Sequence, residues 1–157
     1  MPAAQPLVRR LAWLLAVAGA LPFAAATLAL LSPESHIRIP AIAGMVTYAA
    51  VILSFLGGIE WGVALAEPHA GASPAAKDRH RAAALVVSVL PSLAGWGVLW
   101  LPSPQWQLGA ALGLFVLVWA ADLAFSRQGL LPSWFVDLRT AVTALVALLL
   151  GIALYLL

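Results

Sequence analysis

Three charged residues interrupt long apolar stretches of the chain and are the first candidates for chemistry: Glu60, Asp122 and Arg139. A charged side chain within hydrocarbon costs at least about 2.5–3.5 kcal/mol on insertion scales, so each one needs a partner or a function. Asp122 and Arg139 have opposite charges and lie on neighbouring apolar stretches joined by a short turn. This arrangement predicts an ion pair, and a salt bridge that locks the two stretches together is favoured over a role toward a substrate or proton.

Glu60 has fewer partners, because Arg139 is the one cation expected at its depth. Burial without a full partner favours the neutral carboxyl group and leaves it ready to exchange a proton. A protonated Glu60 bonded to a backbone carbonyl is an equally good structural account. Both interpretations of this residue therefore stay open.

Other kinds of catalytic site have no basis in the sequence. The chain has no Cys, which excludes a thiolate nucleophile and thiolate metal ligands. His36, His69 and His80 form no pair at helical spacing, so no metal site is expected. Nucleophile elbows, phosphate-binding loops and zinc-protease motifs are also absent from the sequence. We expect no enzyme activity and no cofactor.

The composition implies that a membrane bundle positions these residues. Of the 157 residues, 64% are hydrophobic and 9% are charged, against roughly 45–50% and 25% in soluble domains. One small core could not hide so much apolar surface from water. Eight scattered Lys and Arg form no patch that follows a phosphate backbone, so nucleic acid is not an expected partner. The lipid bilayer is the expected partner instead.

Five apolar stretches reach the length of about 20 residues that a helix needs to cross the hydrocarbon. They cover residues 11–31, 41–66, 82–101, 105–125 and 134–157. Their continuous apolar character differs from the alternation of membrane strands, and the first stretch is longer than a signal-peptide core. The sequence predicts an all-α membrane protein, a single integral membrane domain over residues 1–157 that forms a five-transmembrane-helix bundle.

The cations predict the orientation of this bundle. Five spans place Arg38 alone on one side, and all other Lys and Arg on the side of the N-terminus: Arg9, Arg10, Lys77, Arg79, Arg81, Arg127 and Arg139. By the positive-inside rule the N-terminus is cytoplasmic and the C-terminus lies on the opposite side. We expect a multi-pass protein of the cytoplasmic (inner) membrane of a bacterium.

This topology brings the three intramembrane charges to one depth. Each lies roughly 6–9 Å below the cytoplasmic surface at the helical rise of about 1.5 Å per residue. We therefore expect Glu60, Asp122 and Arg139 to form a polar cluster. Trp61 and Trp119 lie close to the acidic residues in the sequence and are candidates for lining a cavity for a flat hydrophobic ligand.

The segment from Ser54 to Gly62, SFLGGIEWG, is the most distinctive in the chain. Its small residues predict a helix-packing motif made by Ser54, Gly57, Gly58 and Gly62. Ser54, Gly58 and Gly62 recur every four residues and form one smooth face that another helix can approach closely. The second span should therefore lie at the centre of the bundle.

The same segment resembles the signature of the transmembrane protein 69-like family of small polytopic membrane proteins, a domain of unknown function. The resemblance extends to Leu21-Pro22-Phe23, to the string SVLPSL at 88–93 and to PSWF at 132–135. It implies a membrane location, in bacteria or mitochondria, and no established activity.

We expect a non-enzymatic accessory or assembly factor of an energy-coupling membrane, whose helices associate with other membrane proteins. The alternative is a small proton-linked carrier that works through Glu60, Asp122 and Arg139, or a membrane protein that binds a hydrophobic ligand. Water access to Glu60 distinguishes a carrier from an assembly factor, which needs only helix packing at this position.

Overall fold

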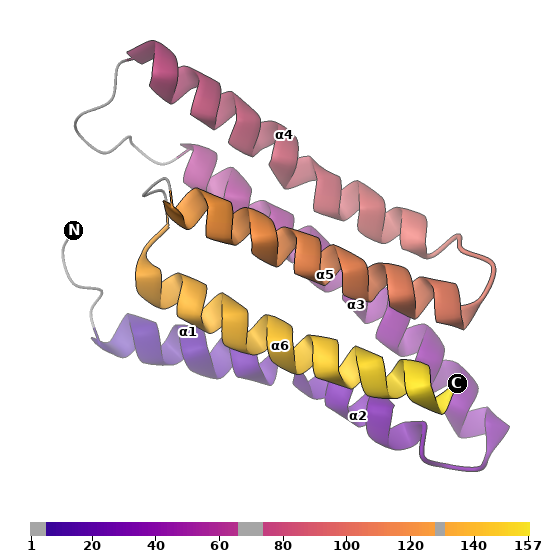
Figure 1. Ribbon diagram of the computed structural model, residues 1–157. Helices are drawn as coiled ribbons and strands as arrows, with labels where there is room; N and C mark the ends of the chain where they lie inside the picture. The colour runs from indigo at the N-terminus through magenta and orange to yellow at the C-terminus, as the bar shows by residue number, and fades with distance from the viewer. Residues whose placement is uncertain (1–5, 66–73, 128–130) are drawn as a thin grey trace.

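The computed structural model describes residues 6–65, 74–127 and 131–157, and for 60, 63–64, 74–81 and 84 it describes the backbone alone. The described residues form helices and no strands, which confirms the all-α prediction. The helices are α1 (Pro6–Ala18), α2 (Leu21–Ala29), α3 (Ser35–Leu65), α4 (Pro74–Val98), α5 (Pro104–Arg127) and α6 (Ser133–Leu156). α1 and α2 run in the same direction and each later helix reverses the direction, so α1 begins and α6 ends at opposite ends of the bundle (Figure 1).

Four segments of the described chain are long and apolar enough to cross a membrane: Pro6–Ala29, Ser35–Ile59, Pro104–Arg127 and Ser133–Leu156. They correspond to four of the five predicted stretches. The remaining stretch, 82–101, corresponds to α4, whose apolar described part is the shorter Leu85–Val98. α4 begins at Pro74, because the Ala, Lys and Arg residues that precede the apolar stretch are strong helix formers. The polar connection predicted up to Arg81 is therefore helical from Pro74 onward.

The first predicted span consists of two helices. Gly19 and Ala20 separate α1 from α2, just before Pro22. Pro22 has no N–H to donate to the carbonyl of Ala18, so the helical ladder is interrupted there. The hydroxyl of Tyr48, on α3, donates to the carbonyl of Gly19 over 3.0 Å. A neighbouring helix thus supplies a hydrogen bond to the interrupted backbone at Gly19, next to the carbonyl of Ala18.

α3 packs against α2, α4 and α5, and its closest approach is to α4 through small residues. A Cβ at Gly57 would overlap the carbonyl oxygen of Ser88. A Cβ at Gly95 would lie 3.3 Å from both the Cα and the carbonyl oxygen of Ala50. Ala50 and Gly57 are two helical turns apart, as are Ser88 and Gly95, so the antiparallel helices meet at two matched positions.

The face of α3 that makes this contact differs from the predicted stripe of Ser54, Gly58 and Gly62. These three residues are exposed, and a Cβ at Gly58 or Gly62 would have no described atom within 4 Å. Gly57 lies about 100° around the helix from Gly58. The contact lies at Gly57 because α4 presents Ser88 and Gly95 at the spacing of Gly57 and Ala50, so small residues from both helices coincide there.

Arg38 joins the carboxyl ends of two helices at the far end of the bundle. Its Nη1 donates to the carbonyl of Leu30, which follows α2, over 2.9 Å. Its Nη2 donates to the carbonyl of Leu156, the last residue of α6, over 2.7 Å. The final carbonyls of a helix have no partner within it and carry partial negative charge. One guanidinium thus caps both α2 and α6.

Candidate functional site

The structure brings two of the three intramembrane charges together. The Nε of Arg139 on α6 donates to the Oδ2 of Asp122 on α5 over 2.6 Å. Asp122 is 3% exposed and Arg139 is 6% exposed, so the pair is sealed inside the bundle. Each charge is the other's partner, which removes the cost of an unpaired charge in the interior.

Asp122 and Arg139 meet because α5 and α6 are antiparallel and the two residues lie at similar distances from the connection between the helices. Asp122 lies five residues before the end of α5 at Arg127, and Arg139 lies six residues after the start of α6 at Ser133. Residues at similar distances from a tight connection come level on antiparallel helices. The pair therefore forms near the connected ends of this helix hairpin.

A second polar link lies beside the ion pair. The indole Nε1 of Trp119, one turn before Asp122, donates to the Oγ1 of Thr140 over 2.9 Å. The hydroxyl of Thr140 in turn donates to the carbonyl of Val136 over 2.8 Å. Trp119 therefore joins α5 to α6.

Arg139 also lines a cavity of about 420 Å³ among α1, α2, α3, α5 and α6, which Asp122 does not reach. Its walls are apolar apart from the side chains of Arg139 and Thr143. Pockets that hold small ligands are typically about 300–1,000 Å³, mostly apolar, with few polar groups. The volume and the lining of this cavity fall within the range of such pockets.

Phenylalanines supply the aromatic part of this cavity: Phe23, Phe55, Phe115 and Phe135. Trp61 and Trp119, the aromatic residues expected from the sequence, are not among the residues that line it. Trp61 is exposed on α3, and the indole of Trp119 is held by Thr140. The sequence places Trp61 and Trp119 at nearly the same depth in the bundle as Glu60 and Asp122. It does not determine toward which side of its helix each indole ring points.

Two polar atoms at the cavity are buried without a hydrogen-bond partner among the described residues: the Nη2 of Arg139 and the Oγ1 of Thr143. Other buried or neighbouring threonines bond the carbonyl four residues earlier, as Thr27 does with Phe23 over 2.8 Å. Thr143 does not. Sequence reasoning missed it, although its position one turn after Arg139 on α6 places both on one face.

Glu60 lies in α3, but its side chain is outside the part of the chain that the structure describes. Its predicted meeting with the ion pair stays a prediction. His69 and the side chain of His80 are also outside the described residues. Among the described residues no three His, Asp or Glu are placed to hold a metal ion, and His36 contacts Glu34 on the surface over 3.1 Å.

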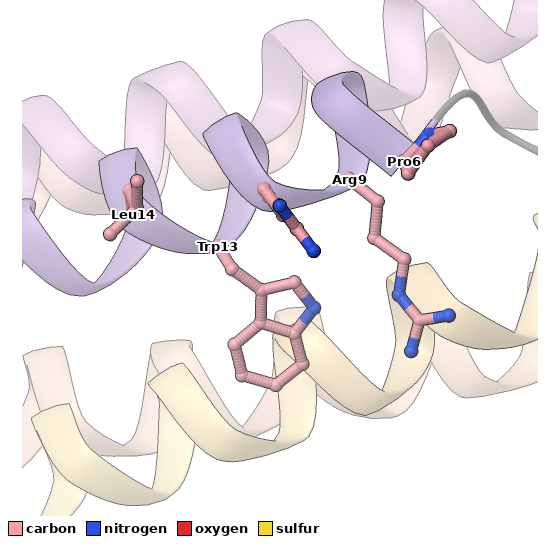
Figure 2. A pocket seen from close by; sticks show the side chains of 5 residues that line it. Pro6, Arg9, Trp13 and Leu14 are labelled. Atoms are coloured by element: carbon pink, nitrogen blue, oxygen red, sulfur yellow. The ribbon is translucent and has the colours of Figure 1, made fainter.

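A second hollow is open and lies at the start of α1, lined by Pro6, Arg9, Arg10, Trp13 and Leu14. Figure 2 shows the side chains of Arg9 and Trp13 extending from the same side of α1, toward the ribbon of α6. Both arginines are exposed. Cations beside an interfacial Trp are typical of contact with lipid headgroups, so this hollow belongs to the membrane surface.

Comparisons with known proteins place the whole chain in one family. The family model described as "Protein of unknown function (DUF3429)" matches residues 8–155. Transmembrane protein 69 of Xenopus tropicalis is 35% identical over 130 residues, which cover 82% of this chain and 47% of that relative. The chain thus spans about half the length of this curated relative. No solved structure matches. The resemblance carried by SFLGGIEWG is confirmed, and the chain belongs to the DUF3429 family of uncharacterised membrane proteins.

Proposed function

We propose that the protein is a non-enzymatic accessory protein of the cytoplasmic (inner) membrane that binds a hydrophobic ligand inside its bundle. The observation that carries the proposal is the apolar cavity of about 420 Å³ beside Arg139. The apolar side chains around this volume lack packing partners on one side, and an apolar occupant from the surrounding lipid phase would supply those contacts.

The ion pair argues against proton transport through Asp122. A proton-linked carrier needs a carboxyl group that is free to gain and lose a proton during its cycle. The carboxylate of Asp122 is instead held by Arg139 at 2.6 Å and sealed from solvent. This arrangement makes a rigid polar wall for a binding site, because moving either charge would leave the other unpaired.

The proposal includes five spans with a cytoplasmic N-terminus. The alternating directions of the helices support five crossings, with α4 as the third (Figure 1). Arg9 and Arg10 in α1 and Arg127 at the end of α5 lie at one end of the bundle, and Arg38 in α3 lies at the other. This distribution supports the orientation given by the positive-inside rule.

A matched pair of substitutions in α1 tests ligand binding. Ala16 lines the cavity, whereas Ala18 is exposed on the same helix and does not line it. Protein purified in mild detergent is extracted with organic solvent, and the extract is analysed by mass spectrometry. We expect a near-stoichiometric hydrophobic molecule with the parent protein and with Ala18→Phe, and a loss of most of it with Ala16→Phe.

Equal retention of that molecule by Ala16→Phe and Ala18→Phe, with both variants folded, would overturn the binding proposal. The same purification tests the accessory role. A membrane protein that co-purifies in a fixed ratio is expected. Its absence from preparations in several mild detergents would contradict the accessory role and leave ligand binding intact.

A further inference from the structure

The open hollow at the start of α1, called the α1 hollow from here on, holds two cations that no described acid balances. Its volume is about 600 Å³, and Arg9 and Arg10 are among its lining residues. Both side chains are exposed, so the atoms of a ligand can reach them. The ion pairs found among the described residues include neither arginine. The charge of the α1 hollow therefore favours an anion.

The lining of the α1 hollow changes from cationic to apolar along the helix. Trp13 and Leu14 follow Arg9 and Arg10 by one turn, about 6 Å further along at about 1.5 Å per residue. α1 opens the apolar span Pro6–Ala29, so the later residues lie deeper in the membrane. Leu14 is 67% exposed there. A ligand lying along α1 thus meets charge near the membrane surface and apolar side chains below it, which is the arrangement of a membrane lipid.

The polar groups that line the α1 hollow are hydrogen-bond donors. A guanidinium and an indole N–H can donate but cannot accept. Figure 2 shows the indole nitrogen of Trp13 on the edge of the ring that faces Arg9, and both residues line the same hollow. Guanidinium groups match the oxygens of phosphate with two parallel hydrogen bonds. Among the groups of a membrane lipid, the phosphodiester fits this set of donors.

The second arginine distinguishes between lipid headgroups. A zwitterionic headgroup carries an ammonium group beside its phosphodiester, and Arg9 and Arg10 both repel that cation. An anionic headgroup presents the phosphodiester without a second cation. The pair of arginines therefore favours anionic phospholipids over zwitterionic ones.

From these observations we infer that the α1 hollow is a binding site for one anionic phospholipid. The phosphodiester accepts hydrogen bonds from Arg9, Arg10 and the indole N–H of Trp13, and an acyl chain runs along Leu14 into the membrane. No residue lines both the α1 hollow and the cavity beside Arg139. The inference is therefore independent of the ligand that is proposed for that cavity.

Native mass spectrometry of the full chain tests the inference. Protein freed of lipid in mild detergent is mixed with equal amounts of phosphatidylglycerol and phosphatidylcholine that carry the same acyl chains, and the first bound lipid is identified. The orientation of the protein in a membrane has no influence in detergent. One basic residue near a membrane surface contributes about fivefold toward anionic lipid, so we expect a preference for phosphatidylglycerol of roughly 5- to 25-fold.

Substitutions of the arginines test whether the α1 hollow is the site. Arg9→Gln and Arg10→Gln should each reduce the preference by about fivefold, whereas Arg9→Lys keeps the charge and should retain most of it. Arg127→Gln removes an exposed cation at the same end of the bundle that does not line the α1 hollow, so it is the matched control. It should leave the preference unchanged.

Trp13→Phe keeps an aromatic ring and removes the N–H donor. Because both lipids have a phosphodiester, we expect this variant to weaken both by about two- to tenfold and to leave the preference between them unchanged. The arginine variants should unfold at the same temperature as the parent protein without lipid, because their side chains are exposed.

Two results would overturn the lipid site. One is equal binding of the two lipids by the parent protein. The other is an equal loss of preference in Arg9→Gln and Arg127→Gln, which would show a general effect of charge. Glycerol phosphate added in excess separates a lipid from a soluble phosphate ester. We expect phosphatidylglycerol to stay bound, and its displacement would assign the α1 hollow to soluble phosphate esters instead.

Discussion

At the scale of single residues, the buried contact between Asp122 and Arg139 ties the helix hairpin to the wall of the cavity. The same guanidinium that bonds Asp122 through Nε presents Nη2 without a partner among the described residues. Asp122 thus fixes the position of a side chain that also forms part of the cavity wall.

Asp122→Asn should destabilise the bundle by on the order of 3–5 kcal/mol, because it strands the buried charge of Arg139. The double variant Asp122→Asn with Arg139→Gln should recover much of that loss, since no buried charge remains. Asp137→Asn, at an exposed position of α6, is the matched control and should change stability little. Denaturant unfolding in detergent measures the parent protein, these three variants and Arg139→Gln, which completes the double-mutant cycle. A coupling energy near zero would mean that the pair contributes no mutual stabilisation.

At the scale of helices, the small residues of α3 and α4 determine how closely these helices pack. A Cβ has no room at Gly57, against Ser88, and is tight at Gly95, against Ala50. Membrane helices gain little from burying apolar surface, so close backbone contact is a main source of their association. The α3–α4 contact in turn holds the face of α3 that lines the cavity.

Adjacent glycines offer a direct test of this contact. Gly57→Ala places a methyl group against the carbonyl oxygen of Ser88 and should destabilise the protein by about 1–3 kcal/mol. Gly58→Ala meets open space and should be neutral, or stabilising by up to about 1 kcal/mol through helix propensity. Thermal unfolding in the same detergent compares the two variants. Equal effects at both positions would contradict the packing described for α3 and α4.

The sequence predicted some of these features well, for physical reasons. Asp122 and Arg139 stand out because charges are rare in apolar stretches, and their distances from one turn bring them level. The choice between Gly57 and Gly58 depends on the rotation of α3 relative to α4, which a run of small residues does not encode. The cavity combines phenylalanines such as Phe23 and Phe135 from separate helices, and in the sequence they resemble any lipid-facing Phe.

At the scale of the whole molecule, the hydrophobic surface and the distribution of cations determine how the bundle sits in a membrane. Many large apolar side chains on the described surface are exposed, including Trp96, Trp100 and Trp106. Water would penalise such a surface, and lipid accepts it. The cations of α1 and α5 lie at one end, so the bundle is polarised along its axis.

Reporter fusions test the orientation. A reporter inserted between α3 and α4 should be cytoplasmic, and one placed after Leu157 should lie on the opposite side, because three spans, α4, α5 and α6, separate the two positions. Replacing both Arg9 and Arg10 with Gln should increase the fraction of inverted molecules, since these cations flank the first span. Reporters on the same side in the parent protein would exclude the five-span topology.

Arg38 also bears on the order in which the chain assembles. Its bond to Leu30 spans eight residues, whereas its bond to Leu156 spans 118. Because synthesis runs from the N-terminus, the first bond can form as soon as α3 begins to emerge, and the second must wait for the last turn of α6. The bond to Leu30 thus positions the guanidinium of Arg38 early, and the carbonyl of Leu156 binds it late. The bond between α3 and α6 at this end of the bundle is therefore among the last contacts to form during biosynthesis.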